Sequence, residues 1–235
     1  MSDNGVITLD RDVVRRNLFP AAHASVEPWE DFPWHLDRRG FCDTGVPHSS
    51  QALALDYFGT LKGLGQTSRD AVLERIASSI DLPLGGPWQI ELEWRDPANL
   101  LNEPTRTQVD AIARSPSAII LFEAKFGERD GGCCSQTNPT KNGLLQCDGN
   151  YRLQTNPTNG ISSKCALSGK GIRYWDIVPE VMTLDSSASY LPCPFASSWY
   201  QWMRNIVGCG NDSGENGPFG ELVSHPARTA SSHTV

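Results

Sequence analysis

The sequence predicts an α/β protein of the α+β type, in which helices flank a mixed central sheet. Apolar residues recur with a helical period over 48–64 and 67–80. They then alternate with polar residues over 88–96, 106–114 and 118–126, as in half-buried strands. A chain of 235 residues can bury a substantial core, and we expect a single elaborated domain.

The first of these helices is predicted from the stretch HSSQALALDYFGTLKGL at 48–64. Ser49 or Ser50 can cap its N-terminus. Leu53, Tyr57 and Leu61 recur at i, i+4 and i+8, so we expect them to form its buried face. The second helix, at 67–80, would be capped by a hydroxyl at its start, from Thr67 or Ser68.

Three parts of the chain are expected to play different structural roles. Residues 1–47 form an arm that packs on the domain, 48–208 form the core with a Cys-rich insertion at 127–170, and 209–235 form an edge strand and a loose tail. Smaller elements are predicted as helices at 10–18, 145–154 and 197–208 and as an edge strand at 221–225.

The strand at 88–96 reads WQIELEWRD and alternates strictly. Ile90, Leu92 and Trp94 are expected on one face, and Glu91 and Glu93 on the other.

A hairpin is predicted between the next two strands, because Ser115-Pro116-Ser117-Ala118 suits a tight turn with Pro at its second position. Pairing of Ser115 with Ala118 would place Asp110 opposite Glu123 and Gln108 opposite Lys125. These four residues share a charged face. The reverse face is apolar and is expected to join the core: Val109, Ala111, Ile120, Phe122, Ala124 and Phe126.

The charged face predicts a metal site. Directly opposed carboxylates have Cβ atoms about 5 Å apart and repel one another, and a divalent cation removes that cost. The carboxylates of Asp110 and Glu123, the carbonyl of Ala124 and waters form a hard-oxygen set that suits Mg²⁺. Lys125 would then orient the attacking water or stabilise charge that develops on a phosphate.

Asp110 followed by Glu123-Ala124-Lys125 on the next strand resembles the PD-(D/E)xK nuclease superfamily, although Val109 stands where the family usually has Pro. The chain more specifically resembles a bacterial branch of stand-alone nuclease-like proteins in that superfamily. The segments that carry this resemblance span roughly 48–205: HSSQALALDYFG, RTQVDAI, FEAKF, QCDGNYR, KCALSGKGIRYW and CPFASSWYQWMRN. It implies a restriction-endonuclease-like fold and Mg²⁺-dependent hydrolysis of DNA, with Mn²⁺ as a substitute.

The resemblance also implies further members of the site. Glu93, which the strand pattern places on the face of Glu91 and away from Trp94, or Gln51, through its carbonyl or a metal-bound water, would complete the metal shell. Gln146 would orient the substrate, and Tyr151 and Arg152 would contact it. For Gln51, Glu93 and Arg152 the alternative is an ordinary solvated side chain, and the spacing of five between Gln146 and Tyr151 departs from the family's four.

The seven cysteines do not follow a C-x₂-C zinc spacing. Four of them cluster in sequence and are candidates for a structural metal: Cys133, Cys134, Cys147 and Cys165. Some nucleases similar to this one hold an iron–sulfur cluster with four cysteines, one of them far upstream, as Cys42 is here. The candidates are therefore Zn²⁺, an iron–sulfur cluster, or buried reduced thiols with no metal. Cys193 and Cys209 are expected to be core or incidental residues.

Composition and charge restrict which binding partners and which cellular location are expected for this chain. The net charge of −7 argues against non-specific nucleic-acid binding by the whole surface, although a local groove can still be basic. No apolar run approaches the roughly 20 residues of a membrane helix. A polar, acidic N-terminal segment without a signal-peptide pattern favours the cytoplasm.

The leading hypothesis is a Mg²⁺-dependent nuclease with DNA as its partner, endonuclease or exonuclease undetermined. Sequence specificity would need loops, a second copy in a homodimer, or another protein. The alternatives are a catalytically inactive nucleic-acid-binding or interaction protein that keeps the nuclease fold, and a metalloprotein whose Cys cluster is its function.

Overall fold

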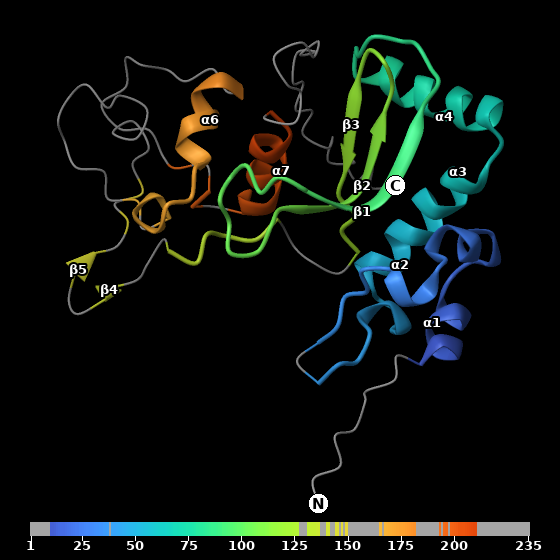
Figure 1. The fold of residues 1–235 in the computed structure, drawn as a ribbon, viewed down its shortest axis with the longest axis horizontal. Coiled ribbons are helices and arrows are strands. Elements are labelled where there is room, and N and C mark those ends of the chain that lie inside the picture. Colours follow the sequence, from blue (N-terminus) through green and yellow to red (C-terminus); the bar gives the residue numbers. More distant parts are fainter. Residues whose placement is uncertain are drawn as a thin grey trace, which may run out of the picture.

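The protein is described by a computed structural model, which combines a three-stranded sheet with several helices and confirms the predicted fold class (Figure 1). Figure 1 shows helices α2, α3 and α4 along one side of the sheet and α6 and α7 on the other. The residues that the structure describes are 10–37, 39–126, 131–136, 140–141, 144–145, 147, 149, 165, 167–181, 193, 195–196 and 198–210.

The sheet has the strand order β1-β2-β3 and is antiparallel at both of these pairings. Its strands are β1 (Gln89–Arg95), β2 (Gln108–Arg114) and β3 (Ile119–Phe122). All three match predicted strands, because each carries the apolar alternation of a half-buried strand.

The predicted hairpin register between β2 and β3 is confirmed. Ala111 lies opposite Phe122, and the amide of Ser115 donates to the carbonyl of Ala118 at 2.8 Å. The predicted length of the third strand is wrong, because β3 ends at Phe122 and residues 123–126 continue outside the ladder. Phe126 is also not in the core, since 51% of it is exposed.

β1 does not keep the strict alternation that its sequence predicts. Ile90 and Leu92 pack in the main core, whereas Trp94 packs with Val109 in a separate cluster. The cause is Glu93, whose φ of 52° lies in the left-handed region and interrupts the strand's alternation. Glu93 is consequently buried instead of sharing a solvated face with Glu91.

The predicted helix at 48–64 is present, but it contains an irregular turn. It consists of α2 (Ser50–Ala54), the π-helical turn η4 (Leu55–Gly59) and α3 (Thr60–Gly63). The hydroxyl of Ser49 caps α2 by accepting from the amide of Ala52.

The buried face of this helix differs from the predicted one. Leu53 and Tyr57 are 40% and 56% exposed, while Leu55 and Phe58 are buried with Leu61. A π turn holds more residues than an α turn, so it shifts the helical phase of the residues after it. Leu61 therefore joins the face of Leu55 and Phe58 rather than that of Leu53.

The second predicted helix is α4 (Gln66–Ser79), which begins after Gly65 without a side-chain cap. The predicted caps Thr67 and Ser68 are therefore wrong. Trp88, which follows α4 and precedes β1, is completely buried in the main core, and Asp70 on α4 accepts from its amide at 2.8 Å.

The segment from residue 10 to 47 packs against the α2 region. It contains α1 (Arg11–Asn17), close to the predicted helix, and three short 3₁₀ helices, η1 (Pro20–Val26), η2 (Trp29–Asp31) and η3 (Asp43–Gly45). Its buried members of the main core are Val14, Leu18, Val26 and Trp29.

A second hydrophobic cluster lies between α6 (Tyr174–Val181) and α7 (Tyr200–Gly210). The short 3₁₀ helix η6 (Ser168–Lys170) precedes α6 in the chain. The helix predicted at 197–208 is thus present as α7. In the Cys-rich segment, β4 (Thr140–Lys141) pairs with β5 (Leu144–Leu145), so the helix predicted at 145–154 is wrong at its start.

Most of the remainder of that predicted helix, and the edge strand predicted at 221–225, lie outside the described residues. Within the described part of the chain, no helix combines the length and apolar character needed to cross a membrane.

Candidate active site

Asp110 on β2 faces the chain as it leaves β3. Its Oδ2 accepts a hydrogen bond from the amide of Ala124 at 2.5 Å. The register between β2 and β3, continued one residue past the end of β3, brings Glu123 to the level of Asp110. The two carboxylates are thus placed together by a tight hairpin, as the sequence predicts.

The pKa of Asp110 reflects its burial and the charged groups that surround it. The pKa of Asp110 is raised from its ordinary 3.8 to about 7, by burial first and then by the negative charges of Glu123 and Glu93. The amide of Ala124 and the charge of Lys125 act in the opposite direction but do not offset the rise. Asp110 is therefore a carboxyl group that takes up a proton near neutral pH unless a cation comes close.

Glu123 is held from two sides. Lys125 Nζ lies 2.8 Å from Glu123 Oε1, and Asn205 Nδ2 on α7 donates to Glu123 Oε2 at 2.9 Å. The side chains of Glu123 and Lys125 are only 8% and 20% exposed. At this burial a charged pair with additional hydrogen bonds has a well-defined geometry.

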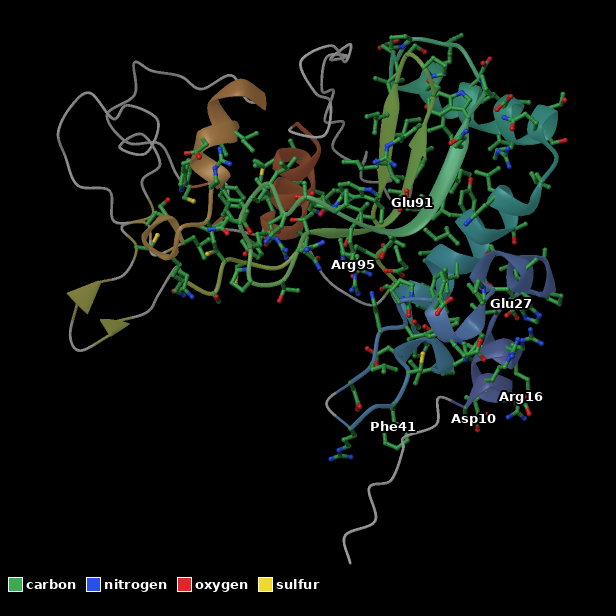
Figure 2. The ribbon with its side chains drawn as sticks, viewed as in Figure 1. Asp10, Arg16, Glu27, Phe41, Glu91 and Arg95 are labelled. Atoms are coloured by element: carbon green, nitrogen blue, oxygen red, sulfur yellow. The ribbon has the colours of Figure 1, made fainter. Side chains whose placement is uncertain are left out.

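Glu93 lies beside Asp110 on the neighbouring strand, and its carboxylate belongs to a network of hydrogen bonds. The register between β1 and β2 places it at the level of Asp110, and its side chain is fully buried. Gln51 Nε2 donates to its Oε1 at 2.6 Å, Gln108 Nε2 donates to its Oε2, and His35 Nε2 lies 3.2 Å from the same oxygen. Figure 2 labels Glu91 and Arg95, which lie on β1 before and after Glu93.

His35 connects the N-terminal arm to this network. The hydrogen bond to Glu93 raises the pKa of His35, and the charges of Glu93 and Asp110 add to the rise while burial opposes it. Gln51 is turned so that its Oε1 accepts from the amide of His35 at 3.0 Å and from the hydroxyl of Thr44. The carbonyl that the sequence offers as a metal ligand thus already has two donors.

The structure brings together five of the predicted site residues, and these are Gln51, Glu93, Asp110, Glu123 and Lys125. Ala124 meets them through its amide. Gln146, Tyr151 and Arg152 lie outside the described residues.

His35 and Asn205 were not predicted from the sequence as members of the site. No sequence pattern around either residue marks it as a member of the site, because each comes from an element far away in the chain. The alternation of β2 predicts that Gln108 lies on the charged face, but it predicts no role for this residue.

The donor set at Asp110 and Glu123 fits a hard divalent cation. Within the described ranges, no three His, Cys, Asp or Glu side chains form a group placed to hold a metal ion. Mg²⁺, however, is commonly held by one or two carboxylates, with waters and substrate phosphates filling its other positions. The raised pKa of Asp110 beside Glu123 indicates negative charge that a cation would neutralise.

We expect Asp110 to make stability depend on pH between about 4 and 7. Its pKa is higher in the folded protein than in the unfolded chain, so the unfolded state loses this proton first as pH rises. The free energy of unfolding of the wild type should therefore fall, relative to that of Asp110→Asn, as pH rises from about 4 to about 7, and stay level above. Urea unfolding of both proteins across this range measures the difference, and a constant difference would contradict the assignment.

The four cysteines predicted as candidates for a structural metal differ in their surroundings. Cys147 and Cys165 form an antiparallel β-bridge, and Cys134 is buried, but Cys133 is exposed. Cys193, expected to be a core or incidental residue, packs against the same hydrophobic cluster as Cys134 and Cys165, as a core residue does.

The two remaining cysteines do not join them within the described part of the chain. Cys42 packs against the main core and bridges to Leu36, and the side chain of Cys209 lies outside the described part.

A protein-family model matches most of the chain. The model of the family REase-ARP, described as Restriction Endonuclease associating with ARP, matches residues 7–219. No curated protein and no solved structure matches the sequence. The family match and the sheet flanked by helices agree in indicating a restriction-endonuclease-like fold. The chain therefore belongs to the REase-ARP family.

Proposed function

We propose that this chain is a Mg²⁺-dependent nuclease of the PD-(D/E)xK type that hydrolyses phosphodiester bonds in DNA. The observation that carries the proposal is the grouping of Asp110, Glu123 and Lys125. Two carboxylates lie at one level of the hairpin, and an ammonium group lies 2.8 Å from one of them. A family described as restriction endonucleases supports a nuclease-related role.

Asp110 and Glu123 would hold Mg²⁺, with waters and the substrate phosphate completing its shell. The bound cation would polarise the scissile phosphate and neutralise its charge. Mn²⁺ would serve in the same position. A cation there would also stabilise the ionised form of Asp110, a partly buried carboxyl group whose pKa is raised to about 7.

Lys125 would orient the attacking water and stabilise the negative charge that develops on the phosphate. Its ammonium group is held in place by Glu123, and Asn205 fixes the other oxygen of the same carboxylate. Holding a catalytic group in one orientation lowers the entropic cost of reaching the transition state.

Glu93 has a supporting role in this proposal. Its carboxylate already interacts with Gln51, Gln108 and His35, so it supports β1 behind Asp110 and need not bind the cation directly. Substrate contacts by Gln146, Tyr151 and Arg152 remain proposals that rest on the resemblance to the PD-(D/E)xK superfamily.

A second candidate is an interaction protein that keeps the nuclease fold without catalysis. Two observations favour it. The net charge of −7 is unfavourable for binding DNA phosphates, and the description of the family names an association.

The test is a cleavage assay with the purified chain and supercoiled plasmid. We expect nicked or linear product with Mg²⁺ or Mn²⁺ and none with EDTA. Closed circles and linear duplexes compared side by side separate endonuclease from exonuclease activity. Binding of DNA without cleavage of either substrate, with both metals present, would support the interaction protein and overturn the nuclease.

A further inference from the structure

Cysteines from four separate stretches of sequence meet beside α6 and α7. Cys147 and Cys165 face each other in a β-bridge. The amide of Cys193 donates to the carbonyl of Gly149 at 2.7 Å, which ties it to the loop of Cys147. The amide of Cys134 donates to the carbonyl of Phe195 at 2.8 Å, which ties it to the loop of Cys193.

The sulfur atoms in this group accept N–H hydrogen bonds. The amide of Gln136 donates to Cys134 Sγ at 3.4 Å, and the amide of Gly149 donates to Cys147 Sγ at 3.3 Å. In both loops the donor is the amide two residues after the cysteine. A thiol is a weak acceptor, whereas a thiolate accepts strongly, so these N–H donors would stabilise a negatively charged sulfur if a cation made the thiolate form favourable.

The other two cysteines have comparable donors. Trp175 Nε1 on α6 donates to Cys165 Sγ at 3.3 Å. The backbone of Phe195, again two residues after the cysteine, hydrogen-bonds to Cys193 and lowers the pKa of its thiol. All four sulfurs thus receive an N–H group, from three similar loops and one helix.

The position of this group is unfavourable for thiolates without a cation. Burial raises the pKa of the Cys193 thiol to about 12, and the nearby sulfurs of Cys147, Cys165 and Cys134 add to the rise. The pKa of Cys134 is raised for the same reasons, by burial first and then by Cys165 and Cys147. The geometry is what points to a bound cation: four cysteines from separate stretches are grouped here, and their sulfur atoms receive N–H donors.

We propose that Cys134, Cys147, Cys165 and Cys193 form a four-thiolate site for Zn²⁺, which fastens the Cys-rich segment onto α6 and α7. Four thiolates are a common ligand set of structural zinc. Such a fastening would stabilise the segment, because its sequence from 127 to 165 is rich in Gly, Asn and Cys and offers little core of its own.

Binding would draw the sulfurs together. No three metal-binding side chains among the described residues form a group placed to hold an ion as they stand. Structural zinc sites commonly form together with the fold around them, so closing of these loops belongs to the binding step. The proposal is independent of the nuclease function, because metal content is measured without DNA.

The first experiment measures metal in the full chain, purified under reducing conditions without chelator. We expect about one zinc per chain and no iron by elemental analysis. Cys147→Ser and Cys193→Ser should lose most of this zinc. Cys133→Ser is the matched control, since it changes the exposed neighbour of Cys134, and it should keep its zinc.

A second measurement keeps the proposal testable if those variants do not fold. A mercurial reagent added to the folded wild type should release zinc as it titrates thiols, and chelation should lower the thermal unfolding midpoint until Zn²⁺ is restored. Co²⁺ substituted for Zn²⁺ should show the absorption of a tetrahedral thiolate site.

Three outcomes would overturn the proposal. One is a wild type that contains no zinc and does not respond to added Zn²⁺. Another is the presence of iron together with visible absorption, which would indicate that the site holds an iron–sulfur cluster instead of zinc. The third is a disulfide between Cys147 and Cys165 in freshly purified protein with blocked thiols.

Discussion

Glu123→Gln is expected to reduce Mg²⁺-dependent cleavage of plasmid at least about a hundredfold, comparable with the loss of one preorganised charge-stabilising group. The substitution keeps the shape of the side chain and an oxygen that can accept from Asn205, which donates to Glu123 at 2.9 Å. It removes the negative charge that would hold the cation together with Asp110.

The stability of this variant should fall much less than its activity. The charge of Glu123 raises the pKa of Asp110, so its removal lowers that pKa and relieves repulsion between the two carboxylates. The substitution also removes the carboxylate that pairs with the Lys125 ammonium, which opposes this gain. We therefore expect a modest loss of resistance to urea, together with loss of Mg²⁺ binding in calorimetry.

Glu91→Gln is the matched control for Glu123→Gln. Glu91 lies on the same sheet, but its side chain is 58% exposed and its ion-pair partner, Arg114, is 3.5 Å away (Figure 2). Glu91→Gln should cleave plasmid at the wild-type rate, so the initial cleavage rates of the two variants should differ at least about a hundredfold. Equal cleavage rates for the wild type and Glu123→Gln would show that Glu123 has no role in the reaction.

Lys125→Met is expected to reduce the cleavage rate by about 10²–10⁴, the range for a group that assists proton transfer or charge stabilisation. Methionine keeps an unbranched, apolar stem of similar length but lacks the ammonium that lies 2.8 Å from Glu123. Mg²⁺ should still bind, because both carboxylates remain, and a loss of rate at saturating Mg²⁺ would separate the role of Lys125 from theirs.

The pH dependence of Mg²⁺ binding provides an independent readout for Lys125. The charge of Lys125 lowers the pKa of Asp110, so its removal should raise that pKa. Mg²⁺ binding by Lys125→Met should therefore require a higher pH than binding by the wild type.

Lys62→Met, which removes an ammonium from α3, should match the wild type in both cleavage rate and Mg²⁺ binding. Unchanged cleavage by Lys125→Met, under conditions in which Glu123→Gln is inactive, would exclude a catalytic role for Lys125.

Local pattern was sufficient to predict the elements and the register that matter most. Alternation located the three strands, and one turn with Pro116 set the pairing that brings Asp110 and Glu123 to the same level. The register of a short hairpin depends on its own turn and on which face is apolar, and both are visible in the sequence.

Local pattern failed where backbone irregularity or a distant contact decided the outcome. The positive φ of Glu93 broke the alternation of β1, and the π turn at 55–59 changed the buried face of the first helix of the core. Glu93 is then stabilised by Gln51 and His35, which come from other elements. Such a departure is favourable only when distant partners stabilise it, so the alternation of β1 alone could not predict it.

The sequence by itself determined the α+β class, the hairpin and the Asp110–Glu123–Lys125 group, because these depend on periodicity and on one tight turn. Tertiary structure alone decided that Asn205 from α7 holds Glu123, that His35 reaches Glu93, and that Cys193 packs in the same cluster as Cys134 and Cys165. These contacts join segments that are far apart in the chain. Their formation depends on how whole elements pack, and no spacing in the sequence records that packing.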